Sequence, residues 1–130
     1  MQAFQHRIRV RYAETDAQGV AHHAAYVPWL EEARIEALRS LGQCYRSLET
    51  SGTFMPVTEV RVRYRSALHF DDVVELTTTV TPVGRTQLRF DTELTRDAAA
   101  IAEASVTVAA VNGSGRPVRV PADVMAALEG

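Results

Sequence analysis

The sequence has little of several features that would mark a particular class of protein. Its one cysteine, Cys44, rules out an intrachain disulfide and fits a reducing compartment, so we expect a cytoplasmic protein. It has no lysine, and all 14 basic residues are arginine, a bias that more often reflects base composition than phosphate recognition. No apolar run is long enough for a signal peptide or a membrane span, so no membrane partner is expected.

Familiar catalytic motifs are also missing. The chain has no G-x-S-x-G elbow, no Walker sequence and no dinucleotide fingerprint. A metal site built from Asp16, His22 and His23 is disfavoured, because adjacent residues at a helix start point in different directions and no further spaced ligand follows. The net charge of −2 gives no general reason to bind nucleic acid. We therefore expect no cofactor, no metal and no nucleic-acid partner.

What the sequence does contain is patterned for a single domain, residues 1–130. The apolar fraction of 46% and the charged fraction of 23% are those of a globular chain that can bury a core without metals or disulfides. Apolar and polar residues alternate, as in strands, over 6–12, 57–65, 73–81, 86–96 and 101–111. Helical spacing runs from Ala24 to Leu41, with Pro28 in the first turn and Gly42 as the cap, and a short helix is expected over 45–50.

These elements predict an α+β protein in which a five-stranded antiparallel sheet wraps around one long helix. The first strand precedes the helix, and the other four follow it through short links, which predicts a serial antiparallel arrangement. The helix carries one apolar stripe and must pack it on one face of the sheet. A doubly wound parallel sheet is excluded, since only one helix separates any pair of strands.

The stretch YAETDAQGVAHHAAYVPWLEEAR, residues 12–34, resembles the signature of the hotdog-fold acyl-CoA thioesterases of the 4-hydroxybenzoyl-CoA thioesterase type. In that family an aspartate is followed by a glycine, by a histidine or tyrosine seven residues after the aspartate, and by a tyrosine that precedes a helix with Glu and Arg. The matching positions are Tyr12, Glu14, Thr15, Asp16, Gly19, His23, Tyr26, Glu31 and Arg34. The resemblance implies the hotdog fold, thioesterase activity and a homo-oligomer, either a dimer or a dimer of dimers (a homotetramer).

The chain departs from this signature close to the expected acyl pocket. Ala21 and His22 stand where a bulky aliphatic and an aromatic residue are usual, and Ala25 stands where Asn often precedes the tyrosine. We therefore expect a reshaped pocket in which His22 lines the wall or lies exposed. Tyr26 is expected either to contact substrate or to anchor the core or an interface.

Asp16 is the candidate catalytic carboxylate. Hydrolysis of a thioester needs a nucleophile, or a base that activates water, together with donors aimed at the carbonyl oxygen. Asp16 would supply the first, and the backbone amides around His23 and Ala24 at the helix start would supply the second. Gly19 would allow a positive φ and bring the backbone close to the substrate. Two alternatives stay open: Asp16 as a turn or capping residue, and a direct proton-transfer role for the His23 imidazole.

Arginines near the pocket mouth would bind the phosphates of coenzyme A, which guanidinium groups recognise with paired hydrogen bonds. The candidates are Arg85, Arg116 and Arg119, and the alternative for each is a solvated surface. On the helix, Glu31 and Arg34 are spaced to form an ion pair.

The predicted function is therefore hydrolysis of an acyl-CoA, or of an acyl group on a carrier protein, to free acid and thiol. Two other functions stay open: a hotdog dehydratase, which the aspartate-before-glycine arrangement disfavours, and a non-catalytic acyl-binding domain that uses the same groove. An antiparallel sheet of this kind leaves an edge strand unpaired, which favours edge-to-edge pairing of two copies. We expect one pocket to take groups from both chains.

Overall fold

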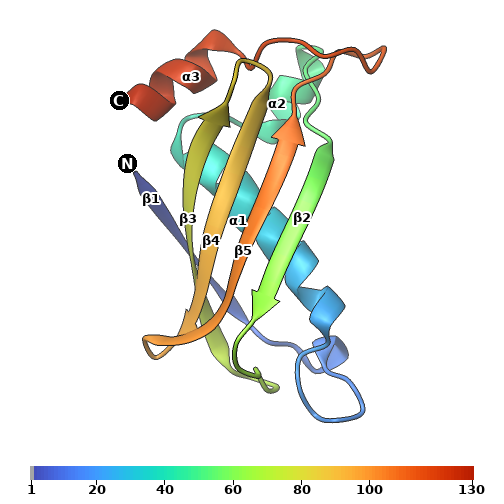
Figure 1. Cartoon of the computed structure of the whole chain (residues 1–130), viewed down its shortest axis with the longest axis vertical. Coiled ribbons are helices and arrows are strands. Elements are labelled where there is room, and N and C mark those ends of the chain that lie inside the picture. Colours follow the sequence, from blue (N-terminus) through green and yellow to red (C-terminus); the bar gives the residue numbers. More distant parts are fainter. Residues whose placement is uncertain (1) are drawn as a thin grey trace.

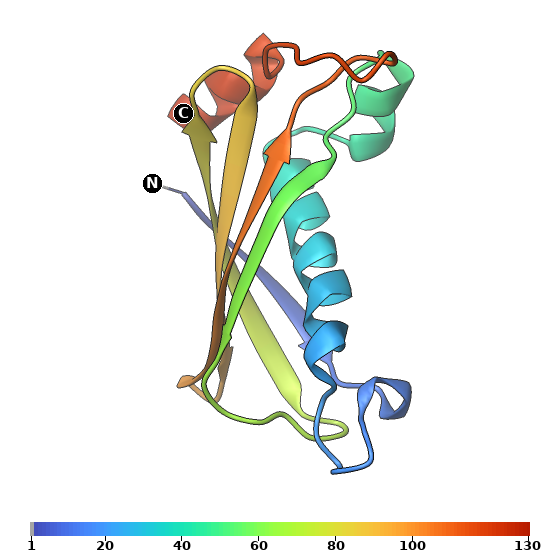
Figure 2. The ribbon, with the colours of Figure 1, turned by 45° about the vertical axis from the view of Figure 1, so that its right-hand side comes forward.

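One antiparallel sheet of five strands forms the framework of the computed structural model, which describes residues 2–130 (Figure 1). Its strands are β1 (Ala3–Arg9), β2 (Val57–Tyr64), β3 (Val73–Val83), β4 (Gln87–Arg96) and β5 (Ala99–Ala109). The sheet curves around the long helix α1 (Tyr26–Ser40), which runs along one face (Figure 2). This arrangement is the expected hotdog architecture.

The helices follow the sequence pattern with one addition. α1 begins at Tyr26, directly after a 3-10 turn over His23–Ala25, so Pro28 falls in the first helical turn. The helix ends in a Schellman motif, in which the N–H groups of Gly42 and Gln43 bond the carbonyls of Arg39 and Leu38. The short helix α2 (Tyr45–Thr50) has the expected bounds, whereas α3 (Ala122–Glu129) was not expected. Within residues 2–130 no helix is both long and apolar enough to cross a membrane.

The core lies between α1 and the concave face of the sheet. Every second side chain of the three central strands faces the helix, as the alternation predicts. The apolar ones among them are Val74, Leu76, Val80, Leu88, Phe90, Leu94, Ala102, Ala104, Val106 and Val108, and Thr78 and Thr92 share this face. From α1, Trp29 and Leu38 are almost fully buried, and a side chain of this kind contributes roughly 2 kcal/mol. Ala33 and Ala37, also buried, are small enough to let the helix approach the sheet.

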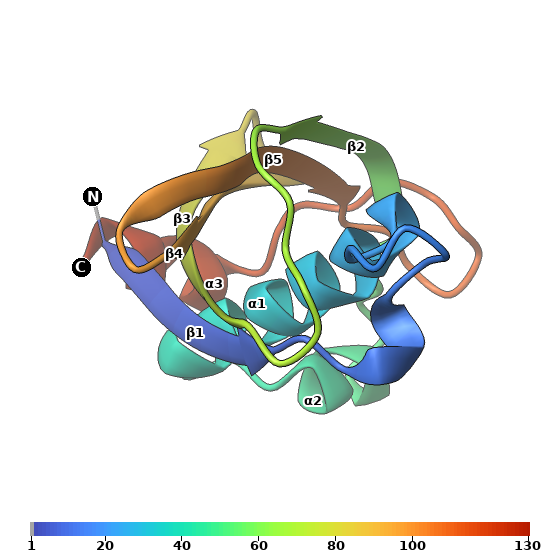
Figure 3. The same cartoon turned by 90° about the horizontal axis from the view of Figure 1, so that it is seen from below.

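The expected serial order of the last four strands is wrong for β2. The order in the sheet is β1-β3-β4-β5-β2, so β2 pairs with β5 at one edge, and β3 lies beside β1. Residues 65–72 carry the chain across the end of the sheet from β2 to β3 (Figure 3). Three strand spacings are about 14 Å, which a link of this length can span, so the link does not force β2 and β3 to pair.

The first strand is also shorter than the alternation predicts. Val10 is buried as expected, but Tyr12 lies in a 3-10 turn (Tyr12–Glu14) and is 77% exposed. The N–H of Val10 still bonds the carbonyl of Asp72, in register with the ladder, and the chain departs at Arg11, whose N–H bonds the carboxylate of Glu14 instead.

A buried hydroxyl pair joins two central strands. Thr78 of β3 and Thr92 of β4 are directly opposite each other, both are buried, and their Oγ1 atoms are 2.9 Å apart. Each hydroxyl depends on the other for its hydrogen bond in an apolar setting, where an unpaired donor is costly.

We expect Thr78→Val to lower the free energy of unfolding by about 1–3 kcal/mol, because it leaves the Thr92 hydroxyl unpaired. The double variant Thr78→Val/Thr92→Val should lose clearly less than the sum of the two single variants, since no unpaired hydroxyl remains. Urea denaturation of all four proteins measures this. Strictly additive losses would show that the two hydroxyls do not depend on each other.

Candidate active site

A tight loop presents Asp16 at the end of the sheet where β1 leads toward α1. Thr15 and Ala21 form an antiparallel bridge, the N–H of Asp16 donates to the carbonyl of Val20 at 2.9 Å, and the N–H of Gly19 donates back to the carbonyl of Asp16 at 3.0 Å. Gly19 has a φ of +81°, the left-handed conformation expected for it, which a side chain would strain. The loop is therefore a closed turn that fixes the backbone of Asp16.

The side chain of Asp16 is half-buried and partly engaged. Its Oδ1 accepts a hydrogen bond of 2.9 Å from the N–H of Gln18, which makes an Asx turn. The turn role that sequence reasoning left open for Asp16 is thus present. It uses one oxygen of the carboxylate, and a carboxylate has a second.

The 3-10 turn before α1 is held by a histidine. Nδ1 of His22 accepts the N–H of Ala24 at 3.0 Å, and the carbonyl of His22 accepts the N–H of Ala25 at 2.9 Å. The Ala24 amide, expected as a donor to substrate, is therefore already occupied. The N–H of His23 has no acceptor among the described residues, so it is the amide of this turn that stays open. The His22 and His23 rings stack with centroids 4.1 Å apart, and both are exposed.

Glu14 ties this turn and the Asp16 loop to the helix. Its carboxylate accepts the N–H of Arg11 at 2.7 Å and the indole N–H of Trp29 at 2.8 Å, and its carbonyl accepts the N–H of His22 at 2.7 Å. Burial by itself raises the pKa of Glu14, but the hydrogen bonds from Arg11 and Trp29 outweigh it and hold the pKa below the usual value. Sequence matching named Glu14 without giving it this role.

The link between β2 and β3 supports the loop from the other side. Val20 bridges His69, and the N–H of Ala21 donates to the carbonyl of Leu68 at 2.7 Å. Asp72 fixes this link, because its carboxylate accepts the His69 N–H and the Arg96 guanidinium, both at 2.8 Å. The His69 amide first, and then Arg96, hold the pKa of Asp72 below the usual value.

Two tyrosines join the helix start to the edge strand. Tyr26 is 2% exposed and packs on Trp29 and Tyr64, each with ring centroids 4.9 Å apart. The expected anchoring role of Tyr26 in the core is confirmed, and its contact with substrate stays a prediction. Tyr64 donates its hydroxyl to the carbonyl of His23 at 2.8 Å. Sequence reasoning missed this contact, because Tyr64 reads as an ordinary apolar position of a strand.

The predicted phosphate-binding arginines lie at the opposite end of the sheet from Asp16. Arg85, in the turn between β3 and β4, and Arg119, before α3, line one groove of about 440 Å³. Arg116 lies in the preceding loop and does not line this groove. Figures 1 and 2 place both segments at the end of the molecule that carries α3, far from the loop after β1. Within one chain these arginines and Asp16 do not form one site.

The expected Glu31–Arg34 ion pair is absent from residues 2–130. Arg34 faces the interior and is 93% buried, whereas Glu31 is exposed. Both residues line one hollow of about 670 Å³, but no ion pair joins them.

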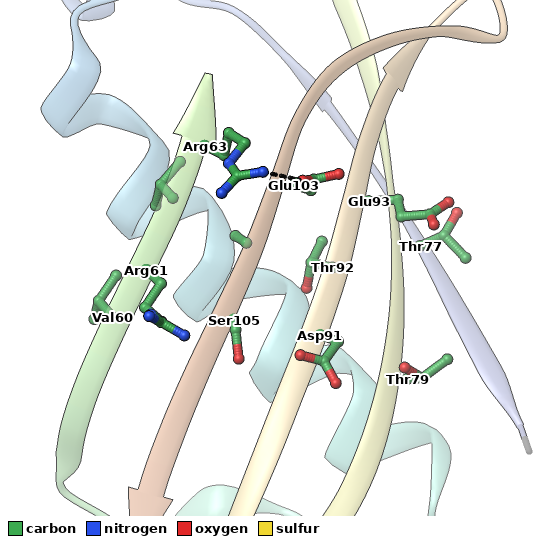
Figure 4. A pocket seen from close by; sticks show the side chains of 12 residues that line it. Val60, Arg61, Arg63, Thr77, Thr79, Asp91, Thr92, Glu93, Glu103 and Ser105 are labelled. Atoms are coloured by element: carbon green, nitrogen blue, oxygen red, sulfur yellow. Dashed lines mark ion pairs between the residues drawn. The ribbon is translucent and has the colours of Figure 1, made fainter. Parts of the chain in front are cut away.

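A hollow of about 870 Å³ on the convex face of the sheet is a separate feature (Figure 4). Rows of polar side chains cross it, and Arg63 pairs with Glu103 at 3.8 Å. No residue of the Asp16 loop or of the turn before α1 lines it. The candidate site is therefore not part of this hollow.

We expect Glu14→Gln to cost about 1–3 kcal/mol of unfolding free energy at neutral pH, because the one oxygen of the glutamine amide can accept only one of the two donors and its NH2 group would face the other. Since folding lowers the pKa of Glu14, its contribution is fully present above the unfolded value of about 4.3 and is lost as pH falls through the lower folded value. The difference between wild type and variant should shrink on acidification. Urea denaturation across this pH range, with the exposed Glu49→Gln as control, measures it, and a difference that stays constant with pH would contradict the assignment.

Comparison with known proteins agrees with the signature. The chain matches the model of the thioesterase-like superfamily over residues 10–128. It is 32% identical to a putative esterase of Aquifex aeolicus over 126 residues, which cover 97% of this chain and 98% of that protein. It is 35% identical to the acyl-CoA thioesterase YbgC of Haemophilus influenzae over 126 residues, 95% of this chain and 93% of that one.

Comparison with solved structures gives similar folds. A crystal structure of a hypothetical protein from Thermus thermophilus is similar to the chain with a TM-score of 0.92 and 36% sequence identity, covering 97% of each chain. Both the family resemblance and the architecture expected from the sequence are thereby confirmed. The chain belongs to the thioesterase-like superfamily of hotdog-fold enzymes.

Proposed function

We propose that this protein hydrolyses acyl-CoA thioesters at the site formed by Asp16 and the open N–H of His23. The observation that carries the proposal is the half-buried carboxylate of Asp16 on a closed turn. The Thr15–Ala21 bridge connects this turn to the start of the helix, where the N–H of His23 has no acceptor among the described residues. A carboxylate and a fixed N–H donor are the two groups that this chemistry needs. The similarity to a protein named as an acyl-CoA thioesterase supports the same reaction class.

The His23 N–H would donate to the thioester carbonyl oxygen and stabilise the negative charge that develops on it, helped by the positive end of α1. Asp16 then acts in one of two ways. As a base, it takes a proton from water, the hydroxide adds to the carbonyl carbon, and the C–S bond breaks to release the thiol. As a nucleophile, it forms an acyl-aspartyl anhydride with release of the thiol, and water then cleaves the anhydride. Both routes consume one water and yield the acid and the free thiol.

A second copy of the chain would complete the pocket. α1 packs mainly against β1 and β3, so the helix side of β2 is left uncovered beside Tyr26. β2 is an edge strand, and Val57, Val60 and Tyr64 on it are all more than a third exposed. The backbone N–H and C=O groups along the outer edge of such a strand are available for pairing with another strand. We propose a homodimer in which β2 pairs antiparallel with β2 of the second copy about a two-fold axis, and a dimer of dimers would use the same unit.

Such a two-fold axis would reverse the direction of the partner sheet. The end that carries Arg85 and Arg119 would then lie beside the end of the first chain that carries Asp16. The two guanidinium groups, absent from the Asp16 site of a single chain, would reach it from the partner and bind the phosphates of coenzyme A. Arg116, in the neighbouring loop, would approach from the same side, and Gly19 and His22 would border the acyl group.

We expect Asp16→Asn to lower kcat by at least ~10²-fold with the fold intact. Asparagine can still accept the N–H of Gln18, so the turn survives while the charge is lost. The measurement is thiol release from a panel of acyl-CoA esters, with thermal unfolding to verify the fold. The matched control is Asp123→Asn, in the exposed first turn of α3. Turnover like that of wild type in Asp16→Asn would remove this residue from the mechanism.

Subunit mixing tests whether one pocket draws on two chains. Arg85→Ala/Arg119→Ala should raise KM for CoA esters more than for pantetheine esters, which lack the nucleotide phosphates. When this variant is mixed in equal amounts with Asp16→Asn and the subunits exchange, activity should rise to about a quarter of the wild-type value. Half of the dimers are then mixed, and one of the two pockets in each mixed dimer is complete. Activity equal to the mean of the two variants would place Asp16 and the arginines in one chain, or outside one site.

A further inference from the structure

We infer that Tyr64 is a positioning residue for the reaction: its hydroxyl holds the carbonyl of His23 and so aims the N–H of His23 at the substrate. The inference rests on the proposed function and concerns a residue on a different element, the last position of β2. The phenol oxygen lies 2.8 Å from the carbonyl oxygen of His23, which accepts the hydrogen bond. Tyr64 lies outside the signature, which spans residues 12–34.

The peptide group between His23 and Ala24 is held at both of its polar ends. Its carbonyl is bonded by Tyr64, and its N–H is bonded by Nδ1 of His22 at 3.0 Å. The preceding peptide is fixed as well, since the carbonyl of His22 accepts the N–H of Ala25 at 2.9 Å. Two consecutive peptide planes on either side of one Cα are thereby set. The His23 N–H lies in the first of these planes, and the second plane, which Tyr64 holds, is joined to it at the Cα of His23 and limits its rotation.

The turn needs this external support because it is short. A 3-10 turn of three residues has strained hydrogen bonds and little cooperativity of its own. Without the Tyr64 hydroxyl, the His23 carbonyl would turn toward water and the plane of the peptide would tilt. A misplacement of well under 1 Å at a donor to the reacting oxygen is enough to reduce the rate.

One edge of the Tyr64 ring rests on the core, although the residue as a whole is 47% exposed. It meets the ring of Tyr26 nearly edge-on, at 4.9 Å and 87°, and Tyr26 packs on Trp29. The indole of Trp29 donates to Glu14, whose carbonyl accepts the N–H of His22. The contacts therefore close a ring around the turn, in which Tyr64 provides the link from β2. A hydroxyl placed by such packing can hold a carbonyl in one direction.

The test is Tyr64→Phe, which keeps the aromatic contact with Tyr26 and removes only the hydroxyl. We expect kcat for an acyl-CoA ester to fall about tenfold, with KM changed less than about twofold, because the lost precision matters mainly in the transition state. Amide hydrogen exchange followed by NMR should become faster at Ala24, whose peptide group loses one of its two anchors. Sedimentation of the variant should match wild type, which keeps assembly out of the comparison.

The matched control is Tyr45→Phe. It removes a hydroxyl that also donates to a backbone carbonyl, that of Met55 at 3.1 Å, away from the turn. We expect kcat and Ala24 exchange in this variant to stay at wild-type values. Equal losses of kcat in both variants would assign Tyr64 to general stability and overturn the inference.

Asp16→Asn, assayed alongside, separates the two levels of the argument. If Asp16→Asn is inactive and Tyr64→Phe keeps the wild-type kcat, the positioning role is wrong and the proposed function stands. If Asp16→Asn is fully active, the proposed function fails, and the inference fails with it. A fall in kcat for Tyr64→Phe with Ala24 exchange unchanged would also overturn it, because the peptide group would then be held without the hydroxyl.

Discussion

The carboxylate of Glu14 joins the three segments from which the candidate site is built. The carboxylate accepts hydrogen bonds from the backbone N–H of Arg11, at the end of the first strand, and from the indole N–H of Trp29 on the helix. The backbone carbonyl of Glu14 accepts the N–H of His22. A charged acceptor with several donors in a nearly buried position is a strong constraint. Because it fixes the strand end, the helix and the turn together, the Asp16 loop between them has little freedom.

The site is well supported within one chain and yet open on one side. The helix packs mainly against β1 and β3 and meets β2 through Tyr26 and Tyr64, so most of β2 stays exposed beside the site. A thioester held there would stay in contact with water, whereas stabilisation of an oxyanion by a single N–H is most effective in a closed, dry pocket. The proposed second chain would account both for the unpaired edge of β2 and for the distance of Arg85 and Arg119 from Asp16.

The sequence predicts the elements of this fold better than their order. The alternating pattern locates β3, β4 and β5, because each of these strands has one face in the core and one face outside it. The pattern does not show which strands are neighbours, so the position of β2 in the sheet is predicted wrongly. The spacing of Val124 and Leu128 after Pro121 is the signal that could have revealed α3. In the site, Asp16 and Gly19 follow from the signature. The occupied amide of Ala24 and the hydroxyl of Tyr64 depend on single contacts between distant segments, which a local pattern does not encode.

The most direct test of the account is hydrolysis by the unaltered protein. Purified protein is incubated with acyl-CoA esters of varied chain length and aromatic character, and both free thiol and free acid are measured. The account predicts equal amounts of the two products and a kcat/KM of about 10⁴ M⁻¹s⁻¹ or more for at least one ester. Saturable binding of acyl-CoA with no thiol release from any ester would contradict it and indicate a binding domain, and loss of water from a hydroxyacyl ester with the thioester intact would indicate a dehydratase.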